Sequence, residues 1–189
     1  MKQVYLLVLS VFFYLFTNAQ TSSSVDSVLT NAEKLLNSSP QKALELIGKG
    51  EQLAKAANYT YGLHRATALK GVAYYKIDQY DKANNLFEKT KKQSSEDKDT
   101  VNLTYTTYWL GNLQLHEGSY SKALDLYQEA LILATASGNK PNLARALDGK
   151  ASIYEALNET DKAGELYSQS LKISTESDFH EWIPPLPFH

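Results

Sequence analysis

The sequence predicts an all-α protein, a solenoid of about four antiparallel helical hairpins stacked on one another. Three observations predict it. An alanine recurs every 40 residues, a small residue precedes three of these alanines by 12 positions, and the segments between them have amphipathic helical spacing. Self-similarity at a fixed period of a few tens of residues is the signature of stacked repeats. Each hairpin leaves an apolar face that a neighbouring hairpin must cover.

The repeated positions indicate how the two helices of a hairpin pack. The alanines, each preceded by a lysine, are Ala43, Ala83, Ala123 and Ala163. The bulky apolar side chains that follow four residues later are Ile47, Phe87, Tyr127 and Tyr167. The small residues that come twelve positions earlier are Gly71, Gly111 and Ala151. Small side chains let two antiparallel helices approach closely, and the bulky side chain fills the space beside them.

The helices follow in order from this register. We expect hairpins at about 26–37 with 41–56, 60–77 with 80–94, 99–117 with 120–137, and 141–157 with 160–175. Ser39-Pro40 and Asn158 supply turn or capping chemistry, and Pro141 is placed to open a helix. Asn31 stands where the first hairpin should have its small residue, an irregularity that a terminal unit facing water allows. The repeats span about 26–57, 60–97, 99–138 and 141–177 within a domain at 20–178.

Residues 1–19 predict a signal peptide. Lys2 is their only charge, and the run from Val4 to Phe16 is almost wholly apolar, with small or polar residues after it. A basic start, a short apolar core and small residues before the cut are typical of secretion signals. We expect cleavage after Ala19 and export to the periplasm or the extracellular space. An uncleaved anchor is the alternative, and it would need an apolar run of about 20 residues.

Composition excludes several classes of function. The chain has no cysteine, which excludes disulfides, thiolate metal sites and cysteine nucleophiles. Its 19 basic and 21 acidic residues give a formal net charge of −2, without the basic patch of a nucleic-acid-binding protein. The four histidines lack metal-ligand spacing, and no glycine-rich phosphate loop is present. We therefore expect no metal, no cofactor, no nucleic-acid partner and no enzymatic activity.

The last residues interrupt the repeat. The register would start another hairpin near Ile183, but three prolines fall within residues 184–187, and proline interrupts a helix interior. We expect a proline-rich tail at 179–189 and a last hairpin without a covering helix. Three alternatives could cover that hairpin: the tail lying back over it, a partner protein, or a second copy of the chain in a homodimer. A shortened relative of a longer protein is a further alternative.

This register resembles the tetratricopeptide repeat family, whose signature is a small residue, a tyrosine, an alanine and an aromatic residue. Tyr74 and Tyr154 stand three positions beyond their small residues, and Trp109-Leu110-Gly111 is similar to the family's opening motif, two positions late. The period of 40 exceeds the usual value of about 34 and points to a longer-helix variant. Armadillo and HEAT repeats have such periods but lack this register. The resemblance implies a right-handed α-solenoid over residues 26–175.

In that family the first helix of each hairpin lines a concave groove that holds a peptide or a partner helix. Carried over residue by residue, the resemblance gives candidate groove residues Arg65, Tyr75, Lys76, Tyr105, Tyr108, Asn112, His116, Arg145, Asp148 and Glu155. Tyrosine and arginine are enriched at binding hot spots. Packing within the helices is the alternative role for each tyrosine. Of the positions that form a carboxylate clamp in some family members, only Asn112 matches, so we expect no such clamp.

These features predict a protein–protein interaction or scaffold module that binds a peptide or a partner protein in the groove. The alternative is a sensory input domain, because exported arrays with this period resemble the sensory halves of membrane-bound bacterial histidine kinases. Catalysis is the third and least favoured function. It would rest on Asp148 and Glu155, whose spacing of seven residues is also that of an ordinary solvated helix face.

Overall fold

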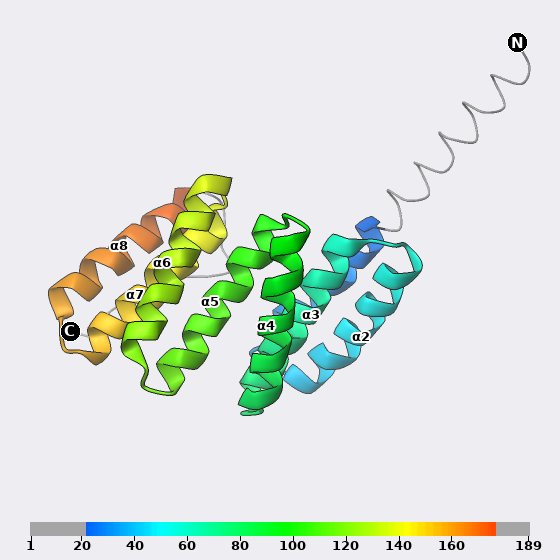
Figure 1. The fold of residues 1–189 in the computed structure, drawn as a ribbon, viewed down its shortest axis with the longest axis horizontal. Coiled ribbons are helices and arrows are strands. Elements are labelled where there is room, and N and C mark those ends of the chain that lie inside the picture. The colour runs from blue at the N-terminus through cyan, green and yellow to red at the C-terminus, as the bar shows by residue number, and fades with distance from the viewer. Residues whose placement is uncertain (1–21, 177–189) are drawn as a thin grey trace, which may run out of the picture. The chain divides into compact units, whose positions relative to one another are not determined.

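The structure is a computed structural model that describes residues 22–176. These residues are helical, with short turns and no strand. A helix over residues 22–35 is followed by α2 (Pro40–Ala56), α3 (Thr60–Lys76), α4 (Tyr80–Glu96), α5 (Thr100–His116), α6 (Tyr120–Ser137), α7 (Lys140–Ala156) and α8 (Thr160–Glu176) (Figure 1). The expected signal peptide at 1–19 and proline-rich tail at 179–189 lie outside the described residues.

The all-α helical-repeat fold predicted from the sequence is confirmed. The seven labelled helices begin and end within two residues of the predicted bounds. The preceding helix differs, because it is already helical at residue 22, four residues before the expected start. Residues 22–24 are serines, which are weak helix formers in a helix interior. The fully buried side chains of Val25 and Leu29 anchor this helix, and such packing outweighs weak local propensity.

The six turns that connect the helices from α2 to α8 share one backbone conformation at intervals of 20 residues. Their left-handed residues, with φ between 51° and 73°, are Asn58, Asp78, Lys98, Gly118, Gly138 and Asn158. Glycine, asparagine and aspartate tolerate this conformation at the end of a helix. Lys98 is the exception, because lysine lacks the short polar side chain that lets asparagine and aspartate offset the steric cost of a left-handed conformation. A helix of 17 or 18 residues and a short turn therefore make half of each repeat.

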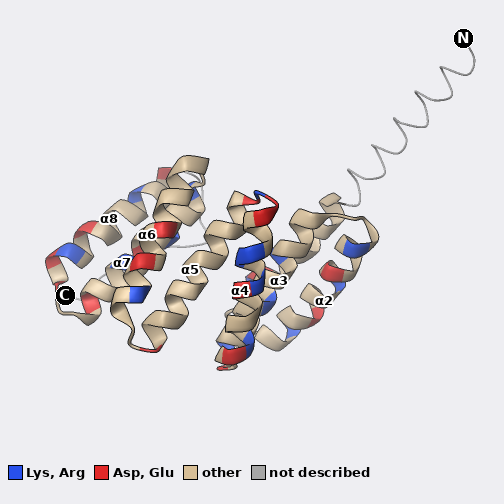
Figure 2. Cartoon of the chain, viewed as in Figure 1, with Lys and Arg blue, Asp and Glu red and all other residues tan. Residues whose placement is uncertain are grey.

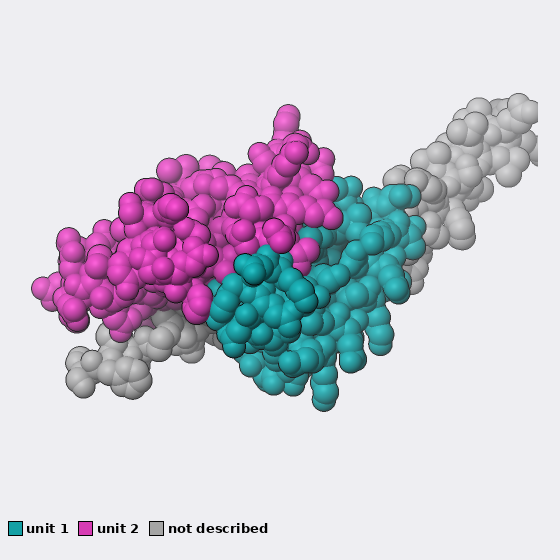
Figure 3. Space-filling view, turned by 60° about the horizontal axis from the view of Figure 1, so that its bottom comes forward, with its two compact units in different colours: residues 1–83 teal, residues 84–189 magenta. Residues whose placement is uncertain are grey.

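The chain divides into two compact units, residues 1–83 and 84–189, each of which is described by itself (Figure 3). In the first unit α2 packs against α3. A Cβ atom added at Gly50 of α2 would meet the Leu29 side chain at 2.5 Å, so the helix over 22–35 lies close to α2 there. Lys70 of α3 pairs with Glu51 of α2 at 3.6 Å.

In the second unit α5 packs against α6 and α7, and α7 also packs against α6 and α8. The side chains of Asp99 and Asn139 cap α5 and α7 by accepting hydrogen bonds from the backbone N–H groups of Asn102 and Asn142. These caps satisfy donors that a helix start leaves unpaired. Among the helices within residues 22–176, none combines the length and the apolar character needed to cross a membrane.

Candidate partner-binding surface

Tyr127 of α6 joins the three helices at the centre of the second unit. Its side chain is fully buried, and Cβ atoms added at Gly111 of α5 and Gly149 of α7 would meet its ring at 2.6 and 2.4 Å. Both neighbouring helices therefore need glycine where the ring lies between them. The Tyr127 hydroxyl donates a hydrogen bond of 2.9 Å to Oδ1 of Asn112. The ring is part of the packed core, and its polar end reaches Asn112, the residue that follows Gly111 on α5.

Tyr167 of α8 repeats this arrangement one hairpin later. Its hydroxyl donates to Oε2 of Glu155 at 2.8 Å and lies 3.3 Å from the hydroxyl of Ser152. Burial, together with the Glu155 carboxylate, raises the pKa of Tyr167 to about 12. The phenol therefore remains a neutral hydrogen-bond donor at physiological pH.

Helical spacing places the predicted residues of α5 and α7 on two neighbouring stripes. We call this surface the α5–α7 face. Its predicted members are Tyr105, Tyr108 and Asn112 of α5 with Arg145, Asp148 and Glu155 of α7, and Ser152 lies on the same α7 stripe. The stripes meet where the Arg145 guanidinium lies over the Tyr105 ring, 5.2 Å from its centroid. Charge enters this face only from α7, because α5 contains no lysine, arginine, aspartate or glutamate (Figure 2).

The α5 stripe is aromatic and half-buried. Tyr105 and Tyr108 make edge-on contacts with Trp109, at centroid distances of 6.3 and 5.5 Å. Trp109 in turn stacks on Phe87 of α4 at 6.2 Å, and the Tyr108 ring lies 5.7 Å from the Tyr127 ring. The rings of Tyr105 and Tyr108 therefore pack on the core, while part of each side chain remains exposed.

Arg145 connects the two stripes by more than its contact with Tyr105. Its Nη1 donates to Oδ1 of Asn142 at 2.9 Å, and the side-chain Nδ2 of Asn142 donates to the backbone carbonyl of Val101 on α5 at 3.2 Å. A cation over an aromatic ring contributes about 0.5 to 1 kcal/mol at an exposed site and more where water is excluded. The direction of the Arg145 guanidinium is thus fixed by contacts with Tyr105 and Asn142.

The α7 stripe contains a buried carboxyl group. Asp148 is 8% exposed, and its Oδ1 has no hydrogen-bond partner in the described part of the chain. Burial, with a contribution from Glu155, raises the pKa of Asp148 to about 7. Glu155 is exposed and stands two turns further along the same stripe. Two carboxyl groups on one helix face are compatible with acid–base chemistry, and they are also compatible with an ordinary polar helix face.

The remaining predicted residues lie elsewhere. Arg65 pairs with Glu33 of the helix over 22–35 at 2.9 Å, so its guanidinium joins two helices of the first unit. Tyr75 contacts the ring of Tyr80 at 5.4 Å, and burial raises the pKa of its hydroxyl. Lys76 and His116 are exposed at the ends of their helices. Within residues 22–176 no group of three histidine, aspartate or glutamate side chains could hold a metal ion.

Sequence reasoning missed the polar ends of Tyr127 and Tyr167, although a signal for them exists. The residue fifteen positions before each bulky side chain changes together with it. The four pairs are Ala32 with Ile47, Val72 with Phe87, Asn112 with Tyr127, and Ser152 with Tyr167. A polar residue occurs only where the bulky side chain carries a hydroxyl, and the structure shows contacts for both polar pairs.

The fold and this face define an all-α helical-repeat protein of the kind that typically serves as a non-catalytic interaction module. The family model described as tetratricopeptide repeat matches residues 103–176, which extend from the first turn of α5 to the end of α8. This match supports the tetratricopeptide interpretation for the two hairpins that carry the α5–α7 face. None of the curated proteins matches the sequence.

Solved structures with a similar fold have low sequence identity to this chain. Aspartyl phosphate phosphatase F from Bacillus subtilis is 18% identical, with a TM-score of 0.66 over 82% of this chain and 41% of its own. A signal transduction ATPase with a tetratricopeptide repeat sensor from Pyrococcus horikoshii is 21% identical, with a TM-score of 0.57 over 89% of this chain and 25% of its own. A putative kinesin light chain from Podospora anserina with TPR-like repeats is 17% identical, with a TM-score of 0.58, over 82% and 77%.

The chain thus spans about two fifths of the phosphatase and a quarter of the ATPase. At these identities the likeness concerns the fold alone.

Proposed function

We propose that the chain is a protein–protein interaction module that binds a peptide segment of a partner protein on the α5–α7 face. The observation that carries the proposal is the Arg145 guanidinium held over the half-buried Tyr105 ring, 5.2 Å from its centroid, where α5 and α7 meet. Tyrosine and arginine are the residues that contribute most binding energy per side chain at interfaces. Fixing them in advance lowers the entropy that is lost when a partner binds.

The chemistry of the face favours a peptide. Aromatic rings from α5 provide apolar contact area, while Asn112 and Arg145 provide an amide and a cation beside them. Partner segments in extended or helical form offer apolar side chains and backbone polar groups in similar alternation. The tetratricopeptide match over residues 103–176 supports the same kind of role.

The test is selection of a displayed library of random 12-residue peptides on the full chain, followed by calorimetric titration of a selected peptide. We expect Tyr105→Ala to weaken its binding by about tenfold or more, which is the effect of truncating a hot-spot residue. Tyr154→Ala is the matched control, because Tyr154 also lies 5.3 Å from a cation, Lys162, but packs between α7 and α8. Equal loss in both variants, or no selected peptide, would contradict the proposal.

We also propose that the protein is exported, on the strength of the basic start and apolar run in residues 1–19. N-terminal sequencing of the protein purified from its native cells should then begin at Gln20. A mature protein that still begins at Met1 would overturn this proposal.

A further inference from the structure

Asp148 is unusual among the charged residues of the second unit because it is buried without a hydrogen-bond donor. It is 8% exposed, and its Oδ1 lacks a partner among the described residues. A buried carboxyl group without a donor costs free energy, so such groups are normally paired or hydrogen-bonded. Asp148 lies between Arg145 and Ser152 on the α5–α7 face, in the register position that Tyr108 has on α5.

The donors nearest to Asp148 along the face are already committed. The Ser152 hydroxyl donates to the backbone carbonyl of Asp148 at 3.1 Å, not to its carboxyl group. The Tyr167 hydroxyl donates to Glu155 at 2.8 Å. The hydroxyl of Tyr127, the corresponding residue one repeat earlier, donates to Asn112. None of these three hydroxyl groups therefore donates to the Asp148 carboxyl group.

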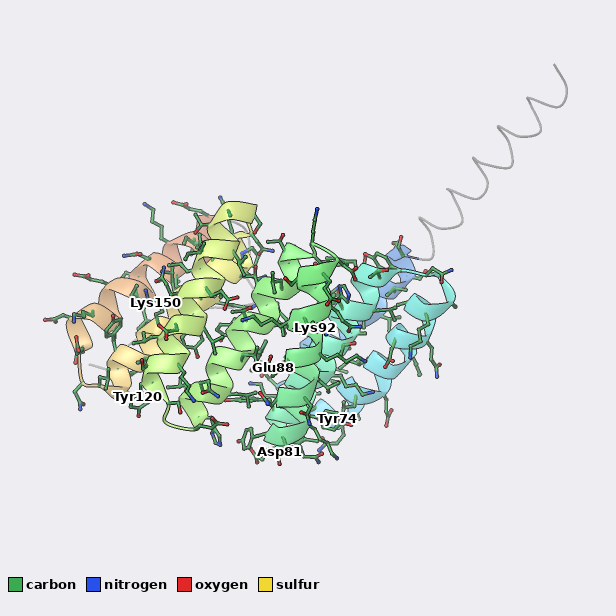
Figure 4. The ribbon with its side chains drawn as sticks, viewed as in Figure 1. Tyr74, Asp81, Glu88, Lys92, Tyr120 and Lys150 are labelled. Carbon is green, nitrogen blue, oxygen red and sulfur yellow. The ribbon has the colours of Figure 1, made fainter. Side chains whose placement is uncertain are left out.

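The cations of α7 on either side of Asp148 are also directed elsewhere. Arg145, one turn earlier, lies over the Tyr105 ring and donates to Asn142. Lys150 projects from α7 and donates to Oε1 of Gln128 on α6 at 2.7 Å (Figure 4). Glu155 adds a second carboxylate two turns further on, with only the neutral Tyr167 hydroxyl bound to its Oε2. The C-terminal half of the α7 stripe is therefore acidic.

We propose that the Asp148 carboxyl group, supported by Glu155, receives the cationic side chain of a lysine or arginine in the peptide segment that binds the α5–α7 face. This inference rests on the proposed function and names the chemistry of its ligand. A cation supplies both the missing donor and the missing opposite charge, and charge-assisted hydrogen bonds are about twice as strong as neutral ones. Its aliphatic stem would lie along the tyrosine rings of α5, as such stems do on apolar surfaces.

The test repeats the 12-residue peptide selection on the full chain and on its Asp148→Asn variant. We expect peptides selected on the wild type to share a lysine or arginine at one position. Asp148→Asn should weaken the binding of such a peptide about thirtyfold or more, because it leaves the cation partly buried without its partner. Replacing the basic residue in the peptide by norleucine should cost a similar factor. Combining both changes should cost little more than either, because the two groups act as a pair.

Asp125→Asn is the matched control, because Asp125 is an exposed aspartate of α6 in the same unit. Its peptide affinity should stay within about twofold of the wild type. Peptides that depend on Tyr105 but contain no shared basic residue, or that bind Asp148→Asn equally well, would overturn this inference and leave the proposed function standing. Selection of no peptide at all would overturn both.

Discussion

Replacing Asp148 by asparagine keeps the shape of the side chain and removes its ability to ionise. The wild-type carboxyl group is 8% exposed, and burial with a contribution from Glu155 raises its pKa to about 7 from an ordinary value of 3.8. Between these two values the folded protein keeps a proton that the unfolded chain has lost. The stability of the wild type therefore falls as the pH rises through this window, and the full penalty is present above the folded pKa.

The size of the penalty follows from the two pKa values. A difference of one pH unit corresponds to about 1.4 kcal/mol. A rise from 3.8 to about 7 therefore sets an upper value of roughly 4.5 kcal/mol, and relaxation of the surroundings reduces it to about 2 to 4 kcal/mol. Asp148→Asn should be more stable than the wild type by this amount near pH 8. The difference should shrink steadily toward pH 4, where both side chains are neutral.

The measurement is urea unfolding followed by far-ultraviolet circular dichroism at several pH values from about 4 to 8. Asp125→Asn, which changes an exposed aspartate of α6, is the control and should show no such pH-dependent gain. A stability difference between Asp148→Asn and the wild type that does not vary with pH would refute the reasoning. So would a variant that is less stable near pH 8, because it would mean that the carboxylate is satisfied in the folded state.

Three further changes test the packing. Tyr127→Phe should cost about 1 kcal/mol of unfolding free energy in the wild type and much less in an Asn112→Val background, measured as a double-mutant cycle in urea. Gly149→Ala should destabilise the protein by about 1 to 3 kcal/mol, because its Cβ would lie 2.4 Å from the Tyr127 ring. Gly164→Ala, with no atom within 4 Å of the added Cβ, should stabilise it by about 0.5 to 1 kcal/mol. Similar effects at both glycines would contradict the tight packing of the Tyr127 ring against Gly149. Lys98→Gly should raise the melting temperature, because glycine adopts the φ of 56° at this position without the steric cost, and the gain should be about 0.5 to 1 kcal/mol of unfolding free energy. A lowered melting temperature would show that the left-handed conformation of Lys98 carries no strain.

The sequence was sufficient for the helices because their determinants are local and repeated. The repeated alanine position, as at Ala123, marks a buried stripe. Gly138 marks the end of one helix and Pro141 the start of the next, and none of these signals depends on distant residues. The same logic located the α5 and α7 stripes, since helical spacing alone decides which side chains share a face. It failed at the first helix, where the buried Val25 outweighs the propensity of the serines before it.

What the sequence did not show depends on which side chain meets which across helices. The position of Arg145 over Tyr105, and not beside Asp148 one turn away on its own helix, is decided by the approach of α5 to α7. Arg65 has the same register position as Arg145, yet it pairs with Glu33 of a neighbouring helix. A repeat predicts which residues occupy equivalent positions, but the contacts that each side chain makes depend on neighbouring residues that differ between repeats.

This contrast separates the constraints on folding from those on recognition. The position at which two helices of a hairpin approach most closely keeps one residue type in every repeat. The fully or almost fully buried alanines from Ala43 to Ala163 leave space there for the neighbouring helix. The face positions vary at the same interval, as Arg65, Tyr105 and Arg145 show. Unlike neighbours account for part of that variation, as the ion pair of Arg65 with Glu33 shows. Under the proposed function, specificity for a cationic side chain would be encoded at the acidic end of the α7 stripe, at Asp148 and Glu155.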